Sequence, residues 1–288
     1  MDINMKIIKA VLVLLILPAI SVYAEEPSSV SQQLQGFNLN GYTNDGKKSW
    51  EVNGSKADIS DDKIKVADVD ANFFGKENAN LKADNGTINK ASGDVHLQDN
   101  VVVTAQRGTK MTTDTLDWDR TKDLVTTSDP VKIVDTQGVV TGTGLTARPN
   151  LKKAQLNENV KAVIQTSKQP QTSASKEQTV TITCDGPMQM DQAKMYAVFN
   201  ENVVAFEAST GREMHADQMR VWFDDKNKKI KKVICTGHVM VKQGGNASYA
   251  DEMVYNGLED TITMTGRPKL VFDTGDKQGS GMFQQMGK

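Results

Sequence analysis

Short runs in which apolar and polar residues alternate cover most of this chain. In residues 95–103, for example, Val95, Leu97 and Val101 fall on one face of an extended strand, whereas His96 and Gln98 fall on the other. Such alternation is typical of a β-strand with one buried face, and the runs are separated by Asp, Asn and Gly residues, which favour turns. Beyond the first 24 residues, no segment keeps the apolar period of a helix. The pattern therefore predicts an all-β protein.

One strand pattern recurs along the chain. The pattern has five alternate positions: two apolar residues, then an acidic residue or glycine, then two more apolar residues. Its copies begin at Val95, Val125, Ala154, Ala197, Val233 and Ile262. Between several copies lies a second strand signature, which carries Asp114, Asp217 or Asp251. A two-strand unit cannot bury its apolar face alone and must stack on its neighbours. The period predicts either a solenoid or a multi-stranded roll.

The two ends of the chain and one internal segment differ from the repeats. Residues 1–24 combine two lysines, an apolar run and a small residue at Ala24, which predicts a cleaved secretory signal peptide, with a retained membrane anchor as the alternative. Residues 166–178 are polar and contain Pro170, which predicts a linker between β domains at 25–165 and 179–273; one continuous roll with an inserted loop is the alternative. Residues 274–288 are rich in Gly and Gln and predict a flexible tail.

Composition and charge exclude several classes of function. Lys and Arg total 34 against 36 Asp and Glu, a net charge of -2, so no basic field exists to hold nucleic acid. The two cysteines, Cys184 and Cys235, form no CxxC pair, and they are interpreted either as a disulfide or as two buried thiols. The three histidines form no HExxH motif, and no GxSxG motif occurs. The sequence predicts no catalytic residue, no metal site, no cofactor and no enzyme activity.

Two other functions fit the repeats. An extracellular β-solenoid enzyme acting on polysaccharide would need clustered carboxylates, and Asp114, Asp217 and Asp251 do recur at equivalent positions. Recurrence in every copy favours a capping role, because an active site need occur only once. The remaining alternative is a structural β-repeat scaffold that binds no lipid.

The order of motifs resembles a known family. Residues 37–52, 111–118 and 140–145 are similar to the periplasmic LptC protein of lipopolysaccharide export, and residues 186–191, 202–205, 216–219 and 237–241 to the LptA or OstA-type domain. The resemblance implies two tandem twisted β-jelly-roll domains of V-shaped antiparallel strands. It also implies a periplasmic bridge protein that passes lipopolysaccharide through a hydrophobic groove from an inner-membrane ABC transporter toward the outer membrane. If the N-terminal segment is not cleaved, this protein is attached to the inner membrane. The implied protein partners, besides that transporter, are LptA-like or outer-membrane LptD-like jelly rolls.

Alternation selects the residues expected to line this groove, with an ordinary sealed core as the alternative. Only 6% of the residues are aromatic, and long rows of Val, Ala and Thr make slim walls that suit acyl chains. The expected lining residues are Phe37, Leu39, Trp50, Val52, Ile64, Val66, Val101, Val103, Val131, Ile133, Ala154, Leu156, Val160, Ile164, Phe199, Val203, Val239 and Val241. The segments 34–42 and 269–273 are expected to be open sheet edges that bind a related roll by strand addition.

Overall fold

The structure of the protein is a computed structural model. It describes residues 32–43, 45–74, 78–105, 108–166, 178–224, 230–259 and 261–273. The expected signal peptide, the tail and residues 167–177 of the expected linker therefore lie outside the described residues.

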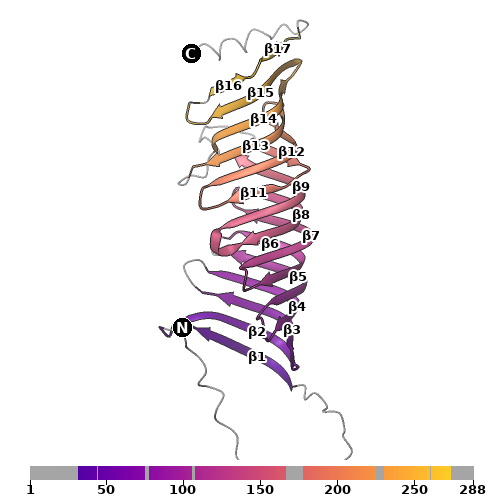
Figure 1. The fold of residues 1–288 in the computed structure, drawn as a ribbon, viewed down its shortest axis with the longest axis vertical. Coiled ribbons are helices and arrows are strands. Elements are labelled where there is room, and N and C mark those ends of the chain that lie inside the picture. Colours follow the sequence, from indigo (N-terminus) through magenta and orange to yellow (C-terminus); the bar gives the residue numbers. More distant parts are fainter. Residues whose placement is uncertain are drawn as a thin grey trace, which may run out of the picture. The chain divides into compact units, whose positions relative to one another are not determined.

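The described residues form one sheet of 17 strands, which confirms the all-β prediction (Figure 1). The strands are β1 (Gln32–Tyr42), β2 (Lys48–Ile59), β3 (Lys63–Phe73), β4 (Ala79–Asn89), β5 (Val95–Ala105), β6 (Lys110–Asp119), β7 (Leu124–Asp135), β8 (Gly138–Arg148), β9 (Lys153–Thr166), β10 (Gln178–Cys184), β11 (Met188–Asp191), β12 (Tyr196–Glu207), β13 (Arg212–Phe223), β14 (Ile230–Gln243), β15 (Asn246–Asn256), β16 (Thr261–Thr265) and β17 (Lys269–Val271). One 3-10 turn, η1 (Pro149–Leu151), joins β8 to β9.

Most strands pair with the strands that precede and follow them along the chain, and β10 with β11, like β16 with β17, share their neighbours instead of pairing with each other. Every pair among the described strands is antiparallel. This arrangement contradicts the solenoid alternative, because the coils of a β-helix stack as parallel strands.

The strands are bent in the middle. β10 and β11 both pair with β9 and with β12, and they are the two arms of one strand that bends at residues 185–187. β16 and β17 both pair with β15 in the same way and are separated by residues 266–268. Most of the longer strands carry the same bend as a shift in register, for example between Gln98 and Val101 in β5 and between Asn200 and Val203 in β12. The bends produce the V-shaped strands that the resemblance implies.

The acidic or glycine position of the repeat forms the bend. Asp99 and Asn100 have φ angles of 65° and 54°, and Glu201 and Asn202 have φ angles of 65° and 50°. Gly237 at the equivalent position in β14 has a φ angle of 77°. Only Gly, and less readily Asn and Asp, adopt this left-handed conformation without a large penalty. Backbone geometry therefore accounts for Asp99, Asn100, Asn202 and Gly237, whereas Asp129 and Glu158, at the same position of the repeat, have no positive φ angle.

The aspartates of the second strand signature lie beside the bends of the following strands. His238 Nδ1 is 2.9 Å from Asp217 Oδ2, and Arg267 Nη2 is 3.9 Å from Asp251 Oδ2. Asn202, at the bend of β12, makes the equivalent contact with the preceding bend: its Nδ2 donates to Asp185 Oδ2 at 2.7 Å. Through these contacts Asp217 and Asp251 cap the bends of the strands that follow them, which is the role that their recurrence favours.

The sheet runs across the expected linker. β9 ends at Thr166, β10 begins at Gln178, and the two strands are direct neighbours, with Ile164 opposite Val180. A buried cluster includes Leu156 of β9 and Phe199 of β12, so the apolar interior is shared by strands on both sides of residues 167–177. The sheet therefore continues through this region, and the domain boundaries stay a prediction.

Candidate functional site

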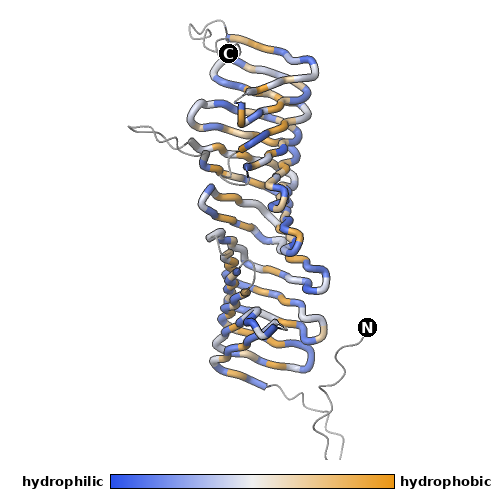
Figure 2. The backbone as a smooth tube through the Cα atoms, turned by 90° about the vertical axis from the view of Figure 1, so that its left-hand side faces the viewer, coloured by the Kyte–Doolittle hydropathy of each residue, from blue (hydrophilic) through white to orange (hydrophobic). Residues whose placement is uncertain are grey.

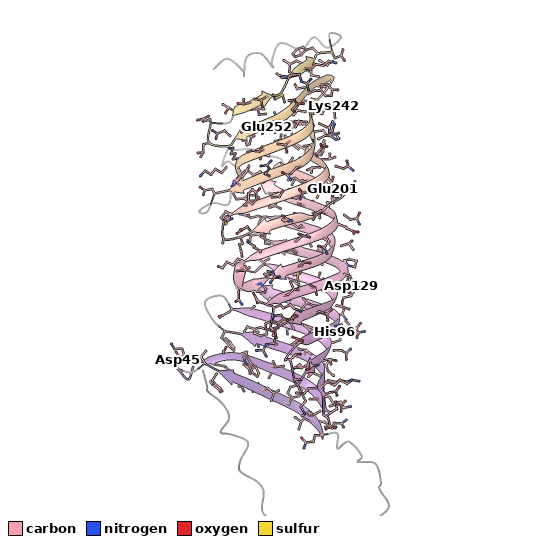
Figure 3. The ribbon with its side chains drawn as sticks, viewed as in Figure 1. Asp45, His96, Asp129, Glu201, Lys242 and Glu252 are labelled. Carbon is pink, nitrogen blue, oxygen red and sulfur yellow. The ribbon has the colours of Figure 1, made fainter. Side chains whose placement is uncertain are left out.

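One face of the bent sheet is apolar, and we call it the inner face. Figure 2 shows hydrophobic and hydrophilic residues alternating along each strand. Burial is greatest beside the bends, where Val101 and Val203 are 0% exposed. Charged residues of the bends, such as Asp129 and Glu201, lie on the outer side of the sheet (Figure 3). The interior is therefore closed by side chains at the bends.

The predicted groove residues nearest the bends are buried. They lie in two apolar clusters, one built on β3 to β6 and the other on β7 to β15. The buried members of the prediction are Val66, Val101, Val131, Leu156, Val160, Phe199, Val203 and Val239. By themselves, these residues form a packed core.

Eight other predicted residues are only half-buried, and all but one of them pack against the two clusters; most lie toward the strand ends, whereas Phe37 lies in the middle of β1. These residues are Phe37, Ile64, Val103, Ile133, Ala154, Ile164 and Val241, and Val52 is half-buried outside the clusters. Leu39 and Trp50, in the first two strands, are 42% and 37% exposed. The inner face thus changes from fully buried at the bends to partly accessible along the arms that carry Val103, Ile133, Ile164 and Val241, whereas Ala197 and Val221, near the ends of β12 and β13, stay fully buried.

The sequence interpretation missed a row of sulfur-containing residues on the inner face. Met219 is opposite Cys235, Cys235 is opposite Met253, and Met253 is opposite Met264. Met219, Cys235 and Met253 are all buried. Methionine is flexible and polarizable, so it adapts to irregular apolar ligands better than a branched side chain does. The alternation rule selects Met219 and Met253, but the expected lining residues of the repeats all come from the other strand of each two-strand unit.

Two buried threonines separate the apolar clusters. The hydroxyl oxygens of Thr113 in β6 and Thr127 in β7 are 3.5 Å apart, and both residues are 6% exposed. Met111 packs against both clusters and connects them past these hydroxyls. The apolar surface therefore continues along the sheet, with one polar position at β6 and β7.

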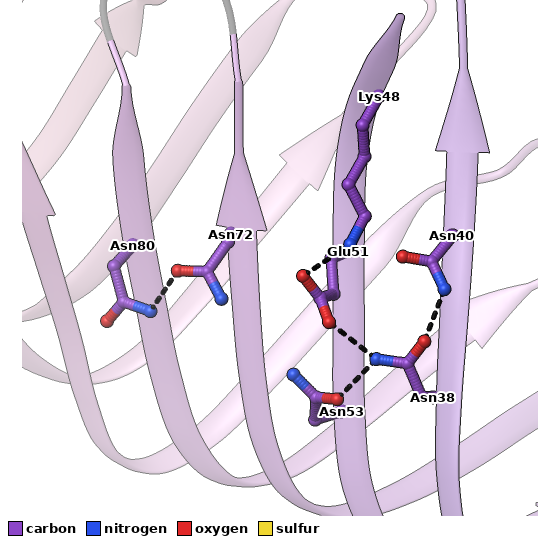
Figure 4. A network of polar contacts seen from close by, with 7 residues as sticks. All are labelled: Asn38, Asn40, Lys48, Glu51, Asn53, Asn72 and Asn80. Carbon is purple, nitrogen blue, oxygen red and sulfur yellow. Dashed lines mark hydrogen bonds and ion pairs between the residues drawn. The ribbon is translucent and has the colours of Figure 1, made fainter.

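Polar residues cover the outer side of the first strands (Figure 4). Asn38 Nδ2 donates to Glu51 at 2.6 Å and to Asn53 at 2.6 Å, and Asn80 donates to Asn72 at 2.9 Å. The pKa of Glu51 is lowered, first by its hydrogen bond from Lys48 and then by that from Asn38. The two faces of these strands are therefore chemically distinct.

Cys184 and Cys235 are free, buried thiols in the structure and do not form a disulfide with each other. Cys184 Sγ donates to the carbonyl oxygen of Gly186 at 3.4 Å, and Cys235 Sγ donates to Met214 Sδ at 3.4 Å. Burial raises the pKa of Cys184 to about 11 and that of Cys235 to about 12. Both are protonated at neutral pH, which makes them poor nucleophiles.

Chemistry beyond apolar contact is sparse in the described part of the chain. No group of three or more His, Cys, Asp or Glu residues is placed there to hold a metal ion. No helix long and apolar enough to cross a bilayer occurs among those residues either.

Two protein families match the chain. A model of the family described as "Lipopolysaccharide-assembly, LptC-related" matches residues 7–165, and a model described as "LptA/(LptD N-terminal domain) LPS transport protein" matches residues 181–286. No curated protein matches the chain. Both families act in lipopolysaccharide transport, and the order of the matches confirms an LptC-like segment followed by an LptA-like one. Since the first match covers more than half of the chain, this protein belongs to the LptC-related family of lipopolysaccharide-assembly proteins.

Proposed function

We propose that this protein is a passive bridge that passes lipopolysaccharide along its inner face, from an inner-membrane ABC transporter toward the outer membrane. The observation that carries the proposal is the gradient of burial on that face. Half-buried apolar residues such as Val103, Ile133, Ile164 and Val241 recur at the ends of successive arms, against fully buried residues at the bends. A row of this kind offers an acyl chain apolar contact from one strand to the next.

Free-energy magnitudes support a bridge over a diffusing carrier. Each methylene moved from an apolar environment into water costs roughly 0.8 kcal/mol, so an acyl chain of about twelve carbons loses on the order of 10 kcal/mol. An apolar inner face compensates for this loss but gives no direction. We therefore propose that the chain itself carries no reaction and no cofactor, and that direction comes from the ATP-driven partner.

We propose that the end strands bind the neighbouring proteins of the bridge. Among the described strands β1 pairs only with β2, and β16 and β17 pair only with β15. Leu34 and Leu39 at one end are exposed, as are Leu270 and Val271 at the other. An open edge with apolar side chains favours strand addition by a related sheet, with LptA-like or LptD-like jelly rolls as the partners.

We also propose a periplasmic location, with the N-terminal segment cleaved as a signal peptide or, alternatively, retained as an anchor in the inner membrane. The match to the LptC-related family begins at residue 7 and includes the apolar run, which favours retention. The mass of the mature protein distinguishes the two outcomes, because cleavage after Ala24 removes the whole run.

Photo-crosslinking tests the lipid path. A photoreactive amino acid at Ile164 or Val241 should crosslink to lipopolysaccharide in cells, because both residues belong to the inner face. The matched controls are the adjacent residues Val163 and Met240, which are also half-buried but alternate to the outer face. Equal crosslinking at inner and outer positions, or none at the inner ones, would overturn the proposal.

A further inference from the structure

A second binding surface lies at one end of the bent strands. A pocket of about 550 Å³ lies among the ends of five strands. These are the C-terminal ends of β8, β11 and β13 and the N-terminal ends of β9 and β12. We call this pocket the rim pocket. Its volume lies in the range of roughly 300–1,000 Å³ that is usual for small-molecule sites.

The register of the sheet places one row of functional side chains along this pocket. The residues of the row are opposite one another on successive strands and are Arg148, Lys153, Asp191, Tyr196, Trp222 and Lys232. Lys194, in the turn between β11 and β12, also lines the pocket, and its Nζ lies 3.8 Å from Asp191 Oδ2. The pocket itself has three cationic side chains and one carboxylate, which leaves a net charge of +2. Such a site favours an anion with several acceptor oxygens.

An aromatic pair forms one wall of the rim pocket. The rings of Tyr196 and Trp222 are 4.8 Å apart and inclined by 45°, and the Lys232 ammonium lies 5.8 Å from the centre of the Trp222 ring. Both aromatic residues are only half-buried. A sugar ring has one face of C–H groups that packs on such a surface, while its hydroxyls need polar partners at the edge.

Polar partners lie in an adjoining hollow of about 630 Å³, which shares Gln189, Tyr196 and Val198 with the rim pocket. Asn200 and Gln218 line it and are hydrogen-bonded to each other at 2.8 Å. Arg220 also lines it, and its buried Nε donates to no acceptor among the described residues. Asn200 also donates to the carbonyl oxygen of Pro187 at 2.7 Å, so the Nε of Arg220 and the amide of Gln218 are the groups that can meet sugar hydroxyls.

The rim row borders the apolar interior directly. The next residues along their strands, Ala154, Ala197 and Val221, belong to the inner-face cluster. Successive side chains of a strand point to opposite faces, so the rim row itself lies on the outer side of the sheet, at the ends of the strands. A molecule with an apolar tail on the inner face reaches the rim pocket around these strand ends.

We propose that the rim pocket binds a phosphorylated saccharide, with the phosphate at Lys153 and Lys194 and a sugar ring on Tyr196 and Trp222. Resting on the proposed function, the molecule that carries this group is the headgroup of the transported lipid. A free sugar phosphate has the same chemistry and is the other source.

Calorimetric titration of the purified full-length protein tests the site. The probes are deacylated lipopolysaccharide, the same saccharide after removal of its phosphates, and glucose 6-phosphate. Deacylated lipopolysaccharide should bind at least about tenfold more weakly to the Trp222→Ala variant and to the Lys153→Gln/Lys194→Gln variant, because each removes one of the two kinds of contact. Lys132→Gln/Lys161→Gln is the matched control, since it removes two exposed lysines outside both hollows.

Each outcome is informative. Loss of affinity on removal of the phosphates supports the site, and binding of glucose 6-phosphate with equal affinity identifies a free sugar phosphate as the source. Absence of binding to the unaltered protein, or equal affinity in the lysine variant and its control, overturns the inference. Because these probes have no acyl chains, the result is independent of crosslinking at Ile164, and failure of the headgroup site is distinguishable from failure of the lipid path.

Discussion

His238 Nδ1 lies 2.9 Å from Asp217 Oδ2, across the bends of the neighbouring strands β13 and β14. The contact joins a residue with a φ angle of 46° to the aspartate of the preceding strand. Asn100 and Asp84, 2.6 Å apart, repeat it in the first half of the chain. The bends are therefore connected from strand to strand on the outer side of the sheet, while apolar side chains pack against one another on the inner side.

Substitution of Gly237 tests the geometry of the bend. Its φ angle is 77°, and a methyl group at this position would overlap the Asp217 carboxylate. We expect Gly237→Ala to lower the free energy of unfolding by about 2–4 kcal/mol, through backbone strain and displacement of Asp217. Gly211→Ala is the control, because Gly211 also has a positive φ but open space around it, and about 1 kcal/mol is expected there. Equal losses in urea denaturation would show that the contact with Asp217 has no effect.

Two methionines test the difference between the faces. Met253 is 0% exposed in the inner-face cluster, whereas Met240 is half-buried on the outer side. Met253→Ala should reduce the free energy of unfolding by about 2–5 kcal/mol, because it leaves a cavity in a packed interior. Met240→Ala should cost less than about 1 kcal/mol. Similar destabilisation of both variants in thermal unfolding would contradict the assignment of the two faces.

Proline at an end strand tests strand addition. Leu39→Pro in β1 removes a backbone donor and should weaken capture of an LptA-like partner roll, and Val271→Pro should do the same at the other end of the sheet. Leu39→Thr keeps the donor while removing the apolar side chain. If binding to an immobilised LptA-like partner falls equally in the proline and threonine variants, the interface is formed by side-chain contacts and not by backbone pairing. The melting temperature of each variant should be measured in parallel to exclude unfolding.

The buried thiols predict a dependence of stability on alkaline pH. Burial raises the pKa of Cys184 to about 11 and of Cys235 to about 12, from an ordinary 9.0. The folded state therefore holds these protons when the unfolded state releases them, and this contribution to stability is complete below pH 9 and lost as pH rises toward 11–12.

The measurement compares the protein with its Cys184→Ala/Cys235→Ala variant. The difference in the free energy of unfolding between the two should be constant below pH 9 and shrink above it. Alkylation with iodoacetamide at pH 8 should be slow in the native protein and should reach both cysteines after denaturation without a reductant. A difference that stays constant up to pH 11 would contradict the raised pKa values.

Alternation predicted which side of each strand faces inward because that property is local. It placed Val101, Val203 and Val239 correctly on the buried face. It did not predict that Leu39 and Trp50 are largely exposed, because these residues lie in the first two strands, where few neighbours pack over them. The burial of a side chain depends on how many neighbouring strands lie on each side of its own strand. The repeat pattern alone does not give the number of these neighbours.

Properties that depend on register were beyond the sequence. The polar segment 166–178 predicts a linker between domains, and the domain boundaries stay a prediction. The sequence did not show that Ile164 and Val180, on either side of residues 167–177, are opposite each other in one sheet. Tyr196 and Trp222 are 26 positions apart in the chain, and only strand pairing places their rings together. The rim pocket was missed for the same reason, since its residues come from five strands and a turn.

The pairing of strands that are near neighbours in the chain has a consequence for biogenesis. Contacts between neighbours in sequence form quickly, and no strand near the N-terminus has to wait for a distant segment. A polypeptide that enters the periplasm from its N-terminus can therefore add one hairpin at a time to the part already folded. On the proposed periplasmic location, export and folding can proceed together, and the growing sheet exposes its newest edge and the open edge of β1 to aggregation.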